Sequence, residues 1–85
     1  MKTKPWYLYI LVCRDKTLYT GITPDVKERV ATHKSGKGAR YTKQHGVLRL
    51  AYVEKLVSRS AALKRETAIK KLTRQSKLDL IKDLC

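Results

Sequence analysis

The sequence is poor in several residue types, and each shortage excludes a class of protein. Its two cysteines, Cys13 and Cys85, stand too far apart to form a disulfide framework or a zinc site. No apolar run approaches the roughly 18 residues that a membrane-spanning helix needs. The stretch after the basic N-terminus is short and rich in tyrosine, and it lacks a small-residue cleavage site, which argues against a signal peptide. We therefore expect a cytoplasmic protein with no membrane segment.

Acidic residues are also scarce. The 85 residues include 7 Asp and Glu against 20 Lys and Arg, which gives a formal net charge of +13. This charge on a small domain creates a positive potential that concentrates polyanions. It favours nucleic acid as the partner, and we expect DNA; an acidic membrane or protein, or lysines that serve solubility alone, are the alternatives. Charge predicts what the protein approaches but not what it does there.

The residue pattern predicts one small α+β domain over residues 1–85. Runs rich in aromatic and β-branched residues predict strands, and capping residues followed by mixed apolar stretches predict helices. We expect strands at 6–13, 18–22 and 48–56, and helices at 24–34, 61–72 and 77–84. Thr23 is expected to cap the first helix, with Pro24 at its first position, and Ser60 to cap the second. The order β-β-α-β-α-α favours a small three-stranded antiparallel sheet flanked by helices.

One carboxylate stands among apolar residues of the second predicted helix. Glu66 shares a helical face with Ala62 and Ile69. A carboxylate in such a place costs free energy unless it meets a cation, hydrogen-bond donors or a metal ion. Glu66 is therefore either a metal ligand or a residue at the edge of the apolar stripe that pairs with Lys70, four positions later.

Arg29 and His33 stand one helical turn apart in the first predicted helix. A guanidinium donates two hydrogen bonds to phosphate oxygens, and an imidazole beside it can donate or relay a proton. The pair therefore suits a phosphate, although a solvated helix flank with a partly packed histidine would show the same spacing. Tyrosines on the predicted strands are expected to be core residues with their hydroxyls at the rim, and these are Tyr7, Tyr9, Tyr19 and Tyr52.

Two short motifs and three charged or polar residues occur in a characteristic order. Tyr7-Leu8-Tyr9 and Tyr19-Thr20-Gly21 lie on the first two predicted strands, and Arg29, His33 and Glu66 follow on the next two predicted helices. This series resembles the GIY-YIG nuclease superfamily over nearly the whole chain. The resemblance implies a GIY-YIG-like fold.

A longer stretch narrows the resemblance. The run YTGIT at 19–23, followed by HKSGKGAR at 33–40, is similar to the small stand-alone UPF0213 or YhbQ-like group, which is related to the nuclease domain of Slx1-type structure-specific endonucleases. The chain departs from the family motif at Tyr7, Leu8 and Thr20, which replace a glycine and two isoleucines. It also has no asparagine, a residue that several family nucleases carry in the site.

The resemblance implies a metal-dependent endonuclease that hydrolyses phosphodiester bonds in DNA, including branched or damaged DNA in repair or recombination. Glu66 would hold one divalent ion, Mg²⁺ or Mn²⁺, and Arg29 would grip the scissile phosphate. Tyr9 would orient or deprotonate the water, with Tyr19 supporting it and His33 relaying the proton. Because a phenol with a pKa of about 10 is a poor base at neutral pH, Arg29 and the metal are expected to lower the pKa of Tyr9.

Basic residues near this site are expected to contact the nucleic-acid backbone. Residues 35–38 are expected to form a flexible basic loop. Tyr41 could stack on an exposed base or anchor this loop on the core. The sequence offers no recognition helix, so we expect weak sequence preference. The expected nucleic-acid contacts are Lys34, Lys37, Arg40, Tyr41, Lys43 and Lys70.

Two other functions are compatible with the same sequence. One is a catalytically weak or inactive nucleic-acid-binding module on the same fold, which the missing asparagine favours, and the other is a protein-interaction adaptor. A protein partner or a dimer could supply the specificity that larger family members take from attached domains. The enzyme requires that Tyr9, Tyr19, Arg29, His33 and Glu66 meet in one cleft.

Overall fold

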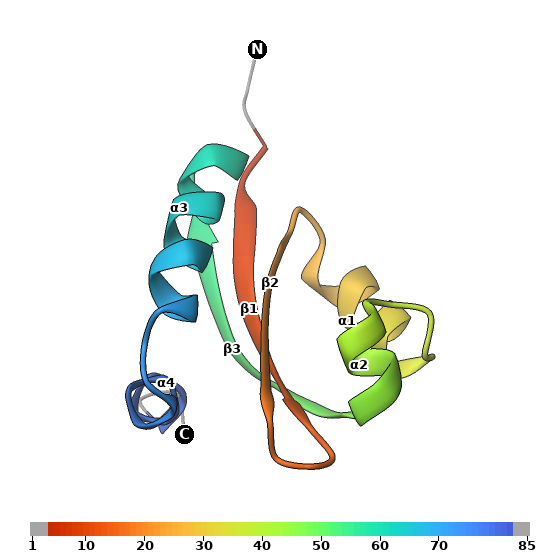
Figure 1. The fold of residues 1–85 in the computed structure, drawn as a ribbon. Helices are drawn as coiled ribbons and strands as arrows, with labels where there is room; N and C mark the ends of the chain where they lie inside the picture. Colours follow the sequence, from red (N-terminus) through yellow and green to blue (C-terminus); the bar gives the residue numbers. More distant parts are fainter. Residues whose placement is uncertain (1–3, 83–85) are drawn as a thin grey trace.

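A computed structural model describes residues 4–82 of the chain. It contains a three-stranded antiparallel sheet of β1 (Trp6–Cys13), β2 (Leu18–Thr23) and β3 (Val47–Leu56), in the order β2-β1-β3. β1 and β2 form a hairpin, and β3 returns along the other side of β1 (Figure 1). The α+β class and the three-stranded antiparallel sheet are therefore as the sequence predicts.

β1 is the central strand and is buried on both faces. Side chains alternate between the two faces of a strand, so Leu8 and Ile10 point to one side while Tyr9 and Leu11 point to the other. All four are at most 2% exposed. Leu8 and Ile10 join the main apolar cluster with Ala51, Ile69 and Ile81. The opposite face of β1 carries Tyr9, and this face is the one on which the candidate site lies.

Helices lie on both sides of the sheet. α1 (Val26–Lys34) and α2 (Arg40–His45) lie on one side, and α3 (Arg59–Lys70) and α4 (Arg74–Lys82) lie on the other (Figure 1). The edge strand β2 runs between the two pairs of helices. Among the described residues, none of these helices is long and apolar enough to cross a membrane.

Two helices begin at other residues than predicted. Asp25, not Thr23, caps α1, because the Asp25 carboxylate accepts a hydrogen bond of 3.1 Å from the backbone N–H of Glu28. Thr23 ends β2, and its hydroxyl oxygen instead accepts a bond from the N–H of Asp25. Ser58, not Ser60, caps α3 by accepting from the N–H of Ala61, so α3 begins and ends two residues earlier than expected. In each case a second polar residue stands two positions from the cap: Thr23 is taken up by the end of β2, and Ser60 lies inside α3.

The C-terminal part also differs from the prediction. α4 begins at Arg74, inside the segment that was expected to separate two helices, and the hydroxyl oxygen of Thr73 accepts a hydrogen bond from the N–H of Ser76. The predicted end of this helix at residue 84 lies outside the described residues. α2 was not predicted at all, so the observed order is β-β-α-α-β-α-α. Its N-cap Ala39 makes no side-chain hydrogen bond, and this leaves the sequence without a start signal.

Candidate active site

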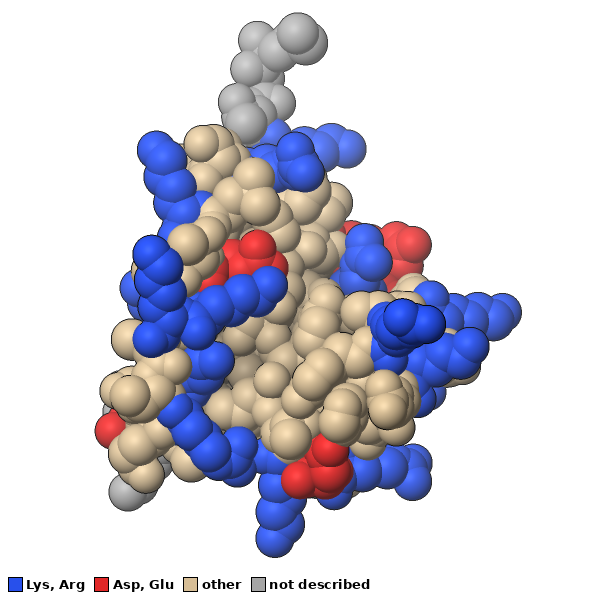
Figure 2. Space-filling view, in the orientation of Figure 1, with Lys and Arg blue, Asp and Glu red and all other residues tan. Residues whose placement is uncertain are grey.

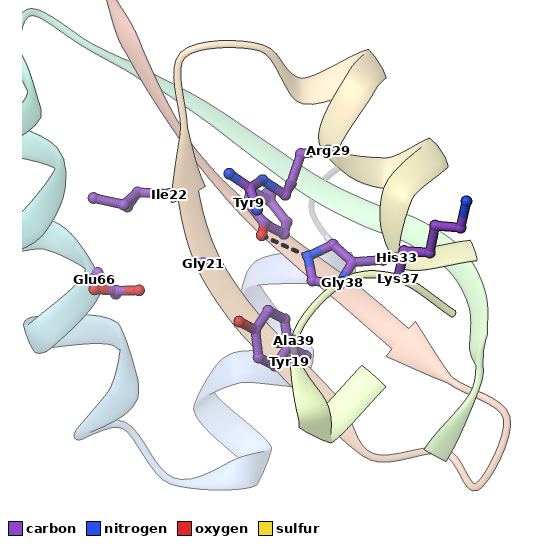
Figure 3. A pocket seen from close by; sticks show the side chains of 10 residues that line it. All are labelled: Tyr9, Tyr19, Gly21, Ile22, Arg29, His33, Lys37, Gly38, Ala39 and Glu66. Atoms are coloured by element: carbon purple, nitrogen blue, oxygen red, sulfur yellow. Dashed lines mark hydrogen bonds between the residues drawn. The ribbon is translucent and has the colours of Figure 1, made fainter. Parts of the chain in front are cut away.

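A cavity of about 420 Å³ opens at the edge of the sheet beside β2. Four elements and one loop contribute to it (Figure 3). All five residues expected to be catalytic line this single cavity, together with others that the sequence did not single out. The lining residues are Tyr9, Tyr19, Gly21, Ile22, Arg29, His33, Lys37, Gly38, Ala39 and Glu66.

Pairing of β1 with β2 places Tyr9 directly opposite Gly21. The Tyr9 ring crosses the space above Gly21, and a Cβ atom at that position would lie 2.5 Å from the Tyr9 hydroxyl oxygen. Only glycine leaves room for the ring. Gly21 therefore lets Tyr9 reach along the sheet toward α1, where its hydroxyl lies 2.9 Å from Nε2 of His33.

His33 is held from both ring nitrogens. Nε2 contacts the hydroxyl of Tyr9, and Nδ1 lies 2.6 Å from Oγ1 of Thr42 in α2. The His33 side chain is only 2% exposed, and the ring centroid of Tyr19 lies 5.2 Å from its own. His33 is thus more deeply buried than a partly packed histidine on a solvated helix flank, which was one of the two predictions. Arg29, one turn earlier, remains exposed and lines the cavity.

Burial disfavours the charged forms of Tyr9 and His33. It is the main cause that raises the pKa of the Tyr9 phenol well above its usual value; Tyr19 and Glu66 add to this, while Arg29 opposes it. Burial, followed by the positive charge of Arg29, lowers the pKa of His33 below that of a free imidazole. Arg29 lowers the pKa of Tyr9, as expected, but desolvation of the phenolate outweighs this one cation, so the pKa is raised overall in the protein without a metal ion.

Glu66 reaches the cavity from α3, on the other side of β2. Its side chain points toward Gly21 in Figure 3, and Lys70 lies 3.4 Å from its carboxylate. The predicted pairing of Glu66 with Lys70 is therefore confirmed, and the same carboxylate also lines the cavity. The pair is partly solvated, with Lys70 at 55% exposure, so it leaves carboxylate lone pairs available.

The donor set suits a cation that keeps much of its hydration. Across residues 4–82 no group of three or more His, Cys, Asp or Glu side chains could hold a metal ion. Glu66 is one carboxylate on an open polar cavity, which leaves space for water and for substrate phosphate oxygens. A single carboxylate completed by water and phosphate is a common arrangement for Mg²⁺. The residues present are thus compatible with Mg²⁺ or Mn²⁺ held by Glu66.

Comparison with known proteins places this geometry in a family. The model of the GIY-YIG catalytic domain matches residues 5–79 of the chain. The chain belongs to the GIY-YIG family. It is 48% identical to the UPF0213 protein SH2523 of Staphylococcus haemolyticus over 77 residues, which cover 91% of this chain and 94% of that protein. It is 49% identical over 78 residues to the UPF0213 protein SAG0778 of Streptococcus agalactiae, covering 92% and 89% of the two chains.

Two solved structures share the GIY-YIG fold seen here. The UPF0213 protein BH0048 from Bacillus halodurans superimposes with a TM-score of 0.59 at 41% identity, over 92% of this chain and 83% of that one. The protein EF2693 from E. faecalis gives 0.63 at 40% identity, over 99% and 91%. A GIY-YIG nuclease domain implies a nucleic-acid substrate, and nucleases of this family generally depend on a divalent metal ion.

Basic side chains border the cavity of this GIY-YIG domain on two sides. Figure 2 shows Lys and Arg over α3 and α4 on one side and over α1 and α2 on the other, with a hollow between them that is mostly uncharged and has an acidic group at its border. Lys37 lines the cavity itself, and Lys70 stands beside Glu66. Lys34 ends α1, while Arg40 and Lys43 lie on α2.

Tyr41 is packed on one side and exposed on the other. Its ring stacks on His45, with centroids 4.2 Å apart, and on Tyr19, with centroids 5.8 Å apart, yet 37% of the residue is exposed. The aromatic row Tyr19–Tyr41–His45 therefore leads from the cavity to the surface of α2. His45 in turn pairs with Asp15 in the turn between β1 and β2, which holds α2 against the hairpin.

Sequence reasoning missed two residues of the site. Thr42 is buried against His33, and Gly38 packs on the same ring so closely that a Cβ there would lie 2.3 Å from Nδ1. The glycines at 36 and 38 were interpreted as flexibility, whereas Gly38 is required for close packing. Gly38 and Thr42 follow His33 by five and nine positions in the sequence. This spacing predicts no contact with the His33 ring until the fold is known.

Proposed function

We propose that the protein is a metal-dependent endonuclease that hydrolyses phosphodiester bonds in DNA, including branched or damaged DNA in repair or recombination. One observation carries the proposal. The Glu66 carboxylate, the Arg29 guanidinium and the hydrogen-bonded pair of Tyr9 and His33 line the same cavity, although they come from β1, α1 and α3, which are separated in the sequence. Each group alone has an ordinary structural role, but their convergence provides the parts that phosphodiester hydrolysis requires.

Arg29 and Glu66 act on the scissile phosphate from opposite sides of β2. Arg29 is exposed and carries no ion pair among the described residues, so its guanidinium is available to donate two hydrogen bonds to phosphate oxygens. Glu66 would hold a divalent cation, and such a cation would supply stabilisation of the negative charge that develops on the phosphate and the departing 3′ oxygen. Tyr19 lines the cavity and supports Tyr9, since the centroids of the two rings lie 6.4 Å apart.

Tyr9 and His33 handle the proton of the attacking water. The Tyr9 oxygen takes a proton from water while its own proton passes to Nε2 of His33, 2.9 Å away. The resulting hydroxide forms a bond to phosphorus, the bond from phosphorus to the 3′ oxygen breaks, and that oxygen takes a proton from solvent. His33 then returns its proton to the Tyr9 oxygen, and the other proton on that oxygen passes to solvent in the cavity. This route avoids a free phenolate, which burial disfavours.

Substrate is held through its backbone by the basic surface around the cavity. The net charge of +13 supplies most of the affinity, so binding depends strongly on salt and weakly on sequence. Tyr41 stacks on an unpaired base, and a protein partner or a dimer supplies further specificity. The residues that make these contacts are Lys34, Lys37, Arg40, Tyr41, Lys43 and Lys70.

A binding module without useful turnover is the second candidate. The observation that favours it is the single carboxylate of the site: among residues 4–82 no other acidic side chain lines the cavity with Glu66. Such a site would hold a divalent cation weakly. The same basic surface would still bind nucleic acid, because it does not depend on Glu66.

A cleavage assay separates the two candidates. Single-stranded, duplex, flap and four-way-junction DNA are incubated with the protein at low salt with Mg²⁺ or Mn²⁺, and Glu66→Gln is purified in parallel. Glu28→Gln, which removes an exposed carboxylate of α1 outside the cavity, is the matched control. Cleavage that EDTA and Glu66→Gln abolish and Glu28→Gln retains establishes the nuclease. Salt-sensitive binding by all three proteins without cleavage establishes the binding module instead.

A further inference from the structure

Thr42 lies behind His33, on the side of the ring away from the cavity. It is 1% exposed, and its side-chain oxygen makes two contacts. Oγ1 lies 2.6 Å from Nδ1 of His33 and 3.0 Å from the backbone carbonyl oxygen of Ala39. These contacts connect α2 to the ring that in turn meets Tyr9.

The chemistry of the donors and acceptors determines which atom donates in each of these hydrogen bonds. A threonine hydroxyl has one hydrogen, and a carbonyl oxygen can only accept. The hydrogen of Thr42 must therefore point at Ala39, and Oγ1 must accept a hydrogen from Nδ1 of His33. In a neutral imidazole the other nitrogen then carries a lone pair, so Nε2 accepts the hydrogen of the Tyr9 hydroxyl.

We propose that Thr42 is a positioning residue that holds His33 in the tautomer with hydrogen on Nδ1, and so makes Nε2 the acceptor for the Tyr9 proton. The catalytic meaning of this arrangement rests on the proposed function, whereas the tautomer itself does not. In the opposite tautomer Nε2 would donate to the Tyr9 oxygen, and no proton could pass from Tyr9 to His33.

The enclosure of His33 leaves Thr42 without a substitute. The ring is 2% exposed, and Gly38 packs against Nδ1 so closely that even a methyl group would not fit there. Water therefore has no open route to Nδ1. If Thr42 became apolar, an N–H at Nδ1 would be buried without a partner, and the hydrogen would move to Nε2, where the Tyr9 oxygen can accept it.

Nitrogen NMR of the histidine ring reads the tautomer without any need for activity. The full chain is labelled with ¹⁵N and studied at a pH where His33 is neutral. We expect wild type and Thr42→Ser to show a protonated Nδ1 and an unprotonated Nε2, and Thr42→Val to show the reverse. Thr67→Val, which removes an exposed hydroxyl that bonds only to a carbonyl of its own helix, should leave the spectrum unchanged.

Kinetics on the same variants test the consequence. Thr42→Val should lower kcat about 10-fold to 100-fold with KM unchanged, and Thr42→Ser should restore most of it. A wild-type protein with hydrogen on Nε2 overturns the proposal, and so does a Thr42→Val protein with the wild-type tautomer. The wild-type spectrum decides even if valine prevents folding. Should the spectra follow the expectation while no protein cleaves DNA, the proposed function fails and the tautomer assignment stands.

Discussion

Gly21→Ala should disable the site while leaving the fold intact. The added Cβ would lie 2.5 Å from the Tyr9 hydroxyl oxygen and 2.7 Å from Cζ of the same ring. Ordinary contacts between such atoms are about 3.5 to 4.0 Å, so the ring must retreat by about 1 Å. Tyr9 is 2% exposed and has His33 and Tyr19 on either side, so it cannot escape into solvent.

The expected effects follow from that displacement. A shift of about 1 Å breaks the 2.9 Å contact between Tyr9 and His33, and a misplacement of this size costs about 100-fold in rate. Overpacking of a buried side chain costs about 1 to 3 kcal/mol. For a domain of this size each kcal/mol lowers Tm by about 4 to 8 °C, so the melting temperature should fall by roughly 4 to 24 °C.

Single-turnover cleavage and thermal unfolding measure the two effects together. Gly36→Ala is the matched control, because no atom lies within 4 Å of its added Cβ and its cost is confined to a backbone φ of +81°. That variant should lose about 1 to 2 kcal/mol of stability and keep its cleavage rate. Wild-type cleavage by Gly21→Ala, with the His33 nitrogen shifts unchanged, would refute the reasoning.

Three further predictions concern single side chains. Tyr41→Leu should weaken binding of single-stranded DNA by about 1 to 3 kcal/mol while Tyr41→Phe retains it, as fluorescence anisotropy would show; equal binding by both argues against stacking. Burial and Arg29 lower the pKa of His33, so the unfolded chain takes up the proton first, and the free energy of unfolding should decrease as the pH falls below about 6.5. Urea denaturation should show that His33→Gln removes this slope. Hydrogen bonds from Thr17, aided by His45, lower the pKa of Asp15 to about 2, so its contribution to stability should be present above about pH 4 and disappear toward about pH 2. Asp15→Asn should remove that part of the acid transition, and an unchanged transition would contradict the assignment.

The strands and the family could be predicted because their signals are local. β1 and β2 could be predicted as a hairpin because both runs are rich in residues with high β propensity and a polar turn separates them. These signals depend only on residues close together in the sequence. The residues that carry the family resemblance follow one another in a characteristic order along the chain. The match to the GIY-YIG catalytic domain confirms the predicted family. Helix starts were less accurate because two capping residues stood close together at each, as with Thr23 and Asp25.

The chain order of Tyr9, Arg29, His33 and Glu66 was readable in the sequence, but their meeting in one cavity was decided by the tertiary structure. No sequence pattern predicts that Gly21 leaves space for Tyr9, or that Thr42 and Gly38 enclose His33. Nor does any pattern predict that α2 forms without a capping side chain. These facts depend on how separate elements pack, β1 against β2 and α1 against α2, which local propensity does not reveal. Composition fixed the charge and local propensity fixed the strands, whereas the protonation states of Tyr9 and His33 depend on burial, which exists only once the elements pack together.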